Sequence, residues 1–199
     1  MLKKLFKDTI IYGIATVLPR VLTLLLTRLY VNKLDTADFG IYSGLFVYLI
    51  LGNVLLSYGI ETAFFRFMNK GERKKKVQST ALTSLTVSSL FFLLIAYLLR
   101  HFIASWLNYD VQYIVFAIYI LVLDALVVIP FAWLRNKGKA KLYAMVKIGN
   151  TALNLALNIY YLNYLSAENL ATNGGVYYIF LANVIASLAT FIVLLPIYL

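Results

Sequence analysis

The sequence contains no cysteine, only three prolines and a single histidine among its 199 residues. Without cysteine there are no disulfide bonds and no cysteine-ligated metal centres. The one histidine, His101, has no serine or carboxylate partner at a spacing typical of catalysis. The sequence also has no phosphate-binding loop, zinc-protease motif or pair of catalytic carboxylates. We therefore expect that the protein is not an enzyme and that it holds no cofactor or metal.

Charged residues are also scarce: they make up 13% of the chain, against about 25% in a typical soluble domain. Hydrophobic residues make up 62%, and the mean hydropathy is +0.83. So large an apolar excess does not fit into one soluble core, which excludes a soluble enzyme and a disordered tail. The net charge of +10 could indicate a nucleic-acid partner. In so apolar a chain it indicates membrane topology instead, and we expect no nucleic acid.

Six apolar stretches are long enough to cross a bilayer, which takes roughly 20 helical residues. They cover approximately residues 9–31, 40–65, 79–99, 112–134, 142–165 and 176–198. The strands of a membrane β-barrel would be shorter and would alternate in polarity. The first stretch is too long for a signal peptide and has no cleavage site. The sequence therefore predicts an all-α membrane protein with six transmembrane helices in one domain, residues 1–199.

Basic residues gather on one side of these predicted helices, which sets the orientation. Lys33 and Arg100 alone lie on the opposite side. Because positively charged loops stay in the cytoplasm, we expect both ends of the chain to be cytoplasmic. A site for anionic membrane lipids is the alternative reading of the lysine run at 74–76. The residues on the basic side are Lys3, Lys4, Lys7, Arg66, Lys70, Arg73, Lys74, Lys75, Lys76, Arg135, Lys137, Lys139, Lys141 and Lys147.

Ionisable residues inside the predicted helices are costly and usually face a partner or a cavity. Arg20 and Asp124 lie at matching depths, roughly 15 Å from the cytoplasmic ends of their helices. Glu61 and Lys147 share a shallower depth. One interpretation is therefore two buried ion pairs, Arg20 with Asp124 and Glu61 with Lys147.

The second interpretation is that the arginines bind an anion. Arg28 has no acidic residue at its depth, so it either binds an external anion or extends to the outer surface. Arg20 and Arg28 are eight positions apart, about 80° around the helix, so one cavity could present both to a phosphate. Pro19 predicts a kink beside Arg20.

The fifth predicted helix carries a stripe of amides, Asn150, Asn154 and Asn158, at four-residue spacing. Such amides either join neighbouring helices or form a hydrogen-bonding wall for a polar solute such as a sugar. The spacing does not distinguish between these two roles.

Three short segments carry a resemblance to a known family. They are Leu-Asp-Thr-Ala-Asp-Phe-Gly-Ile-Tyr at 34–42, Tyr-Gly-Ile-Glu-Thr-Ala-Phe-Phe-Arg-Phe at 58–67 and Phe-Ala-Trp-Leu-Arg-Asn-Lys-Gly-Lys at 131–139. In order and spacing they resemble the Wzx-type polysaccharide-repeat (oligosaccharide) flippases of the multidrug/oligosaccharidyl-lipid/polysaccharide exporter superfamily. The match covers the amino-terminal lobe of these two-lobed transporters.

The resemblance implies a flippase that moves undecaprenyl-diphosphate-linked oligosaccharide across the inner membrane for surface polysaccharide synthesis. It implies a second transmembrane lobe, in cis or in trans, and makes Glu61 and Asp124 the local carboxylates for ion coupling. A basic tail is absent after the sixth stretch, and we expect the gene product to continue or to pair with a second lobe. A multidrug exporter and a non-transporting scaffold for glycan assembly are the alternatives.

Overall fold

The computed structural model describes residues 2–70, 74–164 and 167–198, with side chains described for residues 6–69, 74–164 and 174–198. Arg73 and the last residue of the fifth predicted span lie outside the described residues. Helices account for nearly all of the described chain, and no strand occurs in that part. The prediction of an all-α membrane bundle is confirmed.

The helices follow one another with short connections. They are α1 (Leu2–Lys33), α2 (Thr36–Ser57), α3 (Ile60–Lys70), α4 (Lys74–Leu98), α5 (Arg100–Leu107), α6 (Val111–Leu126), α7 (Val128–Asn136), α8 (Ala140–Tyr164), α9 (Ala167–Leu194) and the short 3₁₀ helix η1 (Leu195–Ile197).

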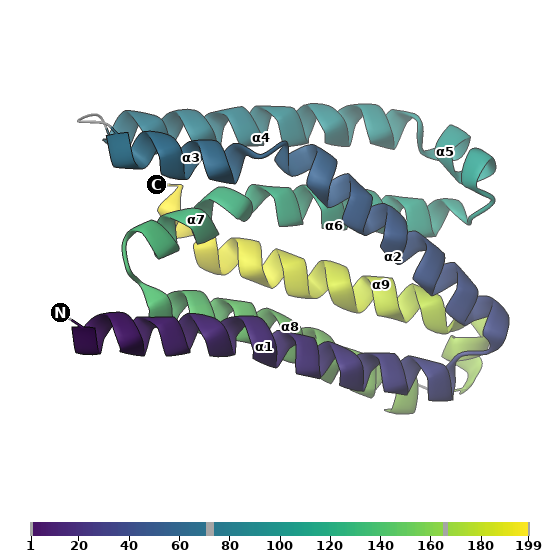
Figure 1. Ribbon diagram of the computed structural model, residues 1–199. Helices are drawn as coiled ribbons and strands as arrows, with labels where there is room; N and C mark the ends of the chain where they lie inside the picture. The colour runs from purple at the N-terminus through teal and green to yellow at the C-terminus, as the bar shows by residue number, and fades with distance from the viewer. Residues whose placement is uncertain (1, 71–73, 165–166, 199) are drawn as a thin grey trace.

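The long helices run side by side in alternating directions, and both ends of the chain lie at the same end of the bundle (Figure 1). Five helical segments of the described residues are long and apolar enough to cross a membrane. They correspond to the first, second, third, fourth and sixth predicted spans. Helix α8 falls outside this set because a lysine and a series of amides interrupt its apolar sequence. The count of six spans therefore stays a prediction.

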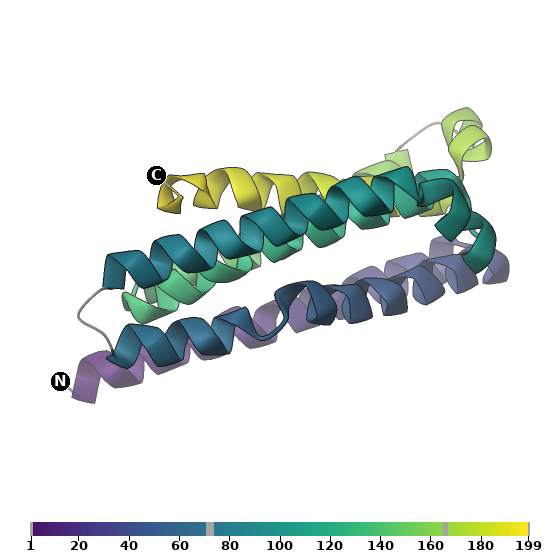
Figure 2. The same cartoon turned by 90° about the horizontal axis from the view of Figure 1, so that it is seen from above.

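Two predicted spans are each divided into two helices. The span predicted at 40–65 breaks between α2 and α3, where Tyr58 and Gly59 have left-handed backbone conformations with φ of 31° and 70° (Figure 2). The span predicted at 112–134 breaks between α6 and α7 at Val127. Helix α1, in contrast, continues through Pro19.

The break between α6 and α7 has a clear chemical cause. Pro130 has no N–H group, so it donates no helical hydrogen bond to the carbonyl of Leu126. The hydroxyl of Tyr198 donates a hydrogen bond of 2.6 Å to that carbonyl instead. The last residue of the sixth predicted span thus stabilises the fourth.

Side-chain caps fix the start of two helices at the opposite end of the bundle. Asp35 accepts a hydrogen bond of 2.7 Å from the N–H of Asp38 at the start of α2. Asp110 accepts one of 2.8 Å from the N–H of Gln112 at the start of α6. Such caps satisfy N–H groups that have no partner within the helix.

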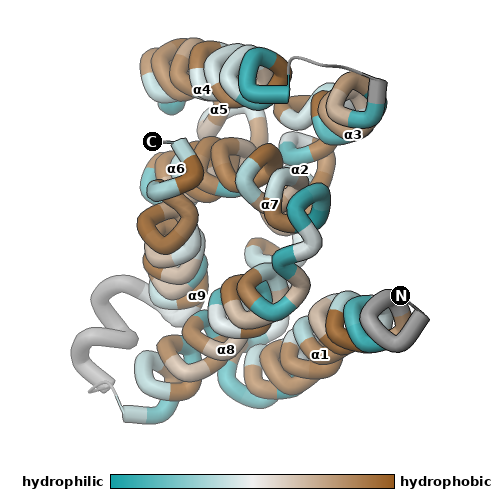
Figure 3. Tube along the Cα trace, turned by 90° about the vertical axis from the view of Figure 1, so that its left-hand side faces the viewer, coloured by the Kyte–Doolittle hydropathy of each residue, from teal (hydrophilic) through white to brown (hydrophobic). Residues whose placement is uncertain are grey.

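The apolar core lies mainly between α2, α4, α6 and α9, and includes Leu45, Ile118 and Phe180. Helix α1 packs mainly against α8, and α8 packs against α9. Seen along the bundle axis, α1 lies apart from α3, with the middle of the bundle between them (Figure 3). This arrangement places α3, α7 and α8 around a common space at the end where the chain begins.

Candidate functional site

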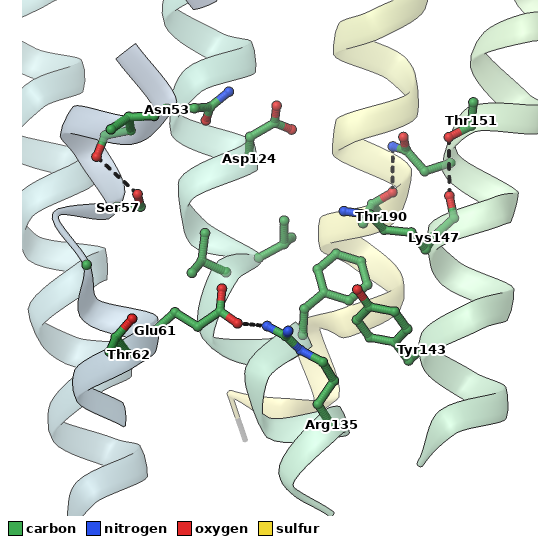
Figure 4. A pocket seen from close by; sticks show the side chains of 16 residues that line it. Asn53, Ser57, Glu61, Thr62, Asp124, Arg135, Tyr143, Lys147, Thr151 and Thr190 are labelled. Atoms are coloured by element: carbon green, nitrogen blue, oxygen red, sulfur yellow. Dashed lines mark hydrogen bonds and ion pairs between the residues drawn. The ribbon is translucent and has the colours of Figure 1, made fainter. Parts of the chain in front are cut away.

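A cavity of about 720 Å³ opens between α2–α3, α6–α7, α8 and α9. Its lining on α8 runs from Tyr143 to Thr151, which places it in the half of the bundle that contains both chain ends. The basic loops predict that this half faces the cytoplasm. Polar side chains dominate the close view in Figure 4. They are Asn53, Ser57, Glu61, Thr62, Asp124, Arg135, Tyr143, Lys147, Asn150, Thr151 and Thr190.

The break between α2 and α3 forms one wall of this cavity. Gly59, Glu61 and Thr62 line it, and they belong to the break and to the first turn of α3. The first N–H groups of a helix have no partner within it, and its N-terminus carries a partial positive charge. The break therefore brings the positive end of a half-helix to the cavity wall.

Glu61 extends from α3 across the cavity and forms an ion pair with Arg135 of α7 (Figure 4). The two side chains are 38% and 36% exposed. The guanidinium carbon of Arg135 lies 5.2 Å from the ring centre of Phe65 and 5.8 Å from that of Tyr143. The predicted pair of Glu61 with Lys147 is therefore wrong, because depth along a helix does not fix the direction of a side chain.

Asp124 on α6 accepts a hydrogen bond of 2.8 Å from the hydroxyl of Ser187 on α9, and Asn53 on α2 also hydrogen-bonds with it. Its electrostatic partner is Lys147, which extends from α8 into the same cavity. The structure does not bring Arg20 to Asp124, so the predicted pair of these two residues is also wrong. Glu61, Asp124, Arg135 and Lys147 thus form a neutral set of four charges in the cavity.

Arg20 and Arg28 do not belong to the cavity lining, and both are exposed on α1. The ring centres of Tyr12 on α1 and Tyr143 on α8 are 5.3 Å apart. The two helices run in the same direction (Figure 1), so Arg20 lies level with Thr151, eight residues beyond Tyr143.

The face of α1 that contains Arg20 is polar. Thr16 and Arg20 lie about 40° and 80° around the helix from Tyr12, which packs against a cavity residue. Arg28 lies about 160° from Tyr12, on the side of the exposed apolar residues Val17 and Leu24. The two arginines therefore project from different faces of the helix.

The amides of α8 have separate environments. Asn150 lines the cavity and donates a hydrogen bond of 2.8 Å to the hydroxyl of Thr190 on α9. Asn158 is buried and donates hydrogen bonds of 2.8 Å to the backbone and side-chain oxygens of Asn154. Only Asn150 of the three contributes to the cavity wall, and it also joins two helices.

Sequence reasoning missed Arg135, Asn53 and Tyr143 as members of the site. Arg135 was counted among the basic residues that set the topology. A signal for it was present, because Arg135 directly follows the apolar run Phe131–Leu134 and so lies at the border of the predicted span 112–134. Asn53 and Tyr143 carry no such signal, since single polar residues are common in membrane helices.

Comparison with known proteins gives a match to one family model. A family model described as "Polysaccharide biosynthesis protein" matches residues 5–199. No curated protein and no solved structure matches the chain. The match covers almost the whole length, so it includes every helix that lines the cavity.

Proposed function

This chain belongs to the polysaccharide biosynthesis protein family, and from that membership we propose that it moves a lipid-linked oligosaccharide across the inner membrane. The match shows the polysaccharide biosynthesis family, and the Wzx-type flippase role that the three short segments indicated is part of the proposal. The proposed substrate is an undecaprenyl-diphosphate-linked oligosaccharide, and the proposed direction is from the cytoplasmic to the outer leaflet.

The observation that supports this function is a polar cavity inside an apolar bundle. Buried polar and charged groups are expensive within a membrane and are typical of substrate pathways. A volume of about 720 Å³ falls in the range of pockets that hold drug-sized molecules, roughly 300–1,000 Å³. The cavity therefore suits a diphosphate with its first sugars, while the polyprenyl tail stays in the lipid.

Within this proposal, Arg20 and Arg28 hold the diphosphate as it moves outward. Arg20 lies level with the far end of the cavity, and Arg28 is two helical turns closer to the outer side. Asn150 offers an amide to the sugars, with Asn154 and Asn158 as further candidates on the same helix. Glu61 and Asp124 are the proposed carboxylates for ion coupling, and a second lobe in cis or in trans closes the pathway.

The carboxylates of the cavity do not favour a cationic drug as the substrate. Each carboxylate has a cation of its own, since Glu61 pairs with Arg135 and Asp124 interacts with Lys147. A carboxylate that is already neutralised attracts a drug cation weakly.

The test is a reconstitution of the chain together with its second lobe, in cis or in trans, into liposomes, followed by measurement of lipid transfer between leaflets. We expect faster transfer of a fluorescent diphosphate-linked oligosaccharide lipid than in liposomes without protein. A cationic dye should show no transport. Transport of the dye without lipid transfer would contradict the proposal and favour a multidrug exporter.

A further inference from the structure

Arg135 and Lys147 are the two cations that line the cavity, from α7 and α8 respectively (Figure 4). The ammonium group of Lys147 makes no hydrogen bond or ion pair with the described residues, and it lies 5.2 Å from the ring centre of Phe131. The Nε atom of Arg135 is buried and has no hydrogen-bond partner in the same part of the chain. Both side chains therefore keep hydrogen-bond donors that no described residue uses.

Glu61 holds the guanidinium of Arg135, but only weakly. The pair is more than a third exposed on both sides, and ion pairs with that exposure contribute little to stability. A phosphate group forms bidentate hydrogen bonds with a guanidinium, as a carboxylate does, and a diphosphate carries more negative charge than a carboxylate. A phosphate in the cavity can therefore replace Glu61 at Arg135.

We propose that Arg135 and Lys147 together bind a diphosphate group, and that Glu61 is the internal anion that occupies this site while it is empty. The inference rests on the proposed function, which supplies the diphosphate as part of the lipid carrier. It adds a first binding position on the cytoplasmic side, before the diphosphate reaches Arg20.

Three features of the site fit this ligand. Arg135 supplies a planar fork for one phosphate, and Lys147 supplies a point charge for the other. The first turn of α3 adds the positive end of a helix dipole at the cavity wall, beside Gly59 and Thr62. The displacement of Glu61 then removes the ion pair that joins α3 to α7.

The experiment measures binding of inorganic pyrophosphate to the purified full chain in phosphatidylcholine nanodiscs by titration calorimetry. We expect Arg135→Gln and Lys147→Gln each to weaken binding by about tenfold or more, because each loses a charge-assisted contact. Glu61→Gln should instead strengthen binding by about threefold or more, because it removes the competing carboxylate. Arg66→Gln on α3 and Lys141→Gln on α8, both exposed and outside the cavity lining, should bind like the parent protein.

The opposite response of Glu61→Gln separates this inference from a purely structural ion pair. Equal affinity in the parent protein and Arg135→Gln, or weaker binding by Glu61→Gln, would overturn it. If Arg135→Gln fails to fold, Arg135→Lys replaces it, since lysine keeps the charge and lacks the bidentate fork. Weaker binding by Arg135→Lys supports the site, and unchanged binding overturns it.

Two further arms identify the source of the diphosphate. Undecaprenyl diphosphate in the nanodisc should displace pyrophosphate, whereas phosphatidylglycerol at the same density should not. Pyrophosphate binding without displacement by the lipid would overturn the assignment to a lipid carrier. Lipid transfer without any pyrophosphate binding would refute this inference alone, and Arg135-dependent binding without lipid transfer would refute the proposed function alone.

Discussion

The hydroxyl of Tyr198 stabilises the break between α6 and α7, and Tyr198→Phe tests this directly. The substitution removes the donor of the 2.6 Å hydrogen bond to the carbonyl of Leu126, and also a hydrogen bond with Thr86. Because Pro130 has no N–H group, the Leu126 carbonyl then has no replacement donor within its helix. Leaving a buried acceptor unpaired costs about 1–3 kcal/mol.

The assay is thermal unfolding of the purified protein in one detergent. For a chain of this length, 1 kcal/mol corresponds to roughly 2–4 °C, so Tyr198→Phe should lower the midpoint by about 2–12 °C. Tyr160→Phe, at an exposed tyrosine of α8, serves as the matched control and should change the midpoint little.

A double substitution makes this prediction stricter. Pro130→Ala restores an N–H group four residues after Leu126, and that group can donate to the same carbonyl. In the Pro130→Ala background, Tyr198→Phe should therefore cost less than it does in the parent protein. The same cost in both backgrounds would refute the role given to Tyr198.

Further predictions concern the charged groups and the orientation. Ser187→Ala removes the 2.8 Å hydrogen bond to Asp124 and should lower stability by about 1–2 kcal/mol in the same unfolding assay; an unchanged midpoint would count against that contact. Arg20→Ala should leave membrane abundance unchanged, because the side chain is exposed, yet reduce surface glycan in a complementation assay. Arg20→Lys should restore part of it, and normal glycan in Arg20→Ala would contradict the role of Arg20. Since the chain has no cysteine, an impermeant thiol reagent on intact cells should label Asn108→Cys and not Lys75→Cys; the reverse pattern would overturn the orientation.

Much of the fold follows from the sequence because the bilayer imposes one dominant requirement. Each crossing needs about 20 apolar residues, so hydropathy identifies the passes and basic loops predict their direction. Helix α8 shows the limit of this reasoning, because its lysine and amides lower its hydropathy while α1 and α9 still cover it. Packing against α1 and α9 therefore accounts for the place of α8 in the bundle better than its hydropathy does.

The breaks and the ion pairs were harder to predict. Gly59 and Pro130 are local signals for a break, but the sequence gives no signal for the left-handed backbone of Tyr58, whose φ is 31°. The pairing was predicted from depth alone, and the structure places Glu61, Asp124 and Lys147 in the cavity lining. Depth does not specify the rotation of a side chain about the helix axis. The partner of Glu61 is therefore Arg135 rather than Lys147, and Arg20 lies on a face of α1 outside the cavity lining.

The most direct test of the central claim is a measurement of lipid transfer after the cavity is filled. Thr151→Trp places a large side chain in the cavity lining of α8, whereas Ala156→Trp places the same side chain at an exposed position of that helix outside the lining. We predict that Thr151→Trp slows transfer of the diphosphate-linked oligosaccharide lipid by about tenfold or more and that Ala156→Trp keeps the parent rate. Equal transfer rates in two well-folded variants would contradict a substrate pathway through this cavity.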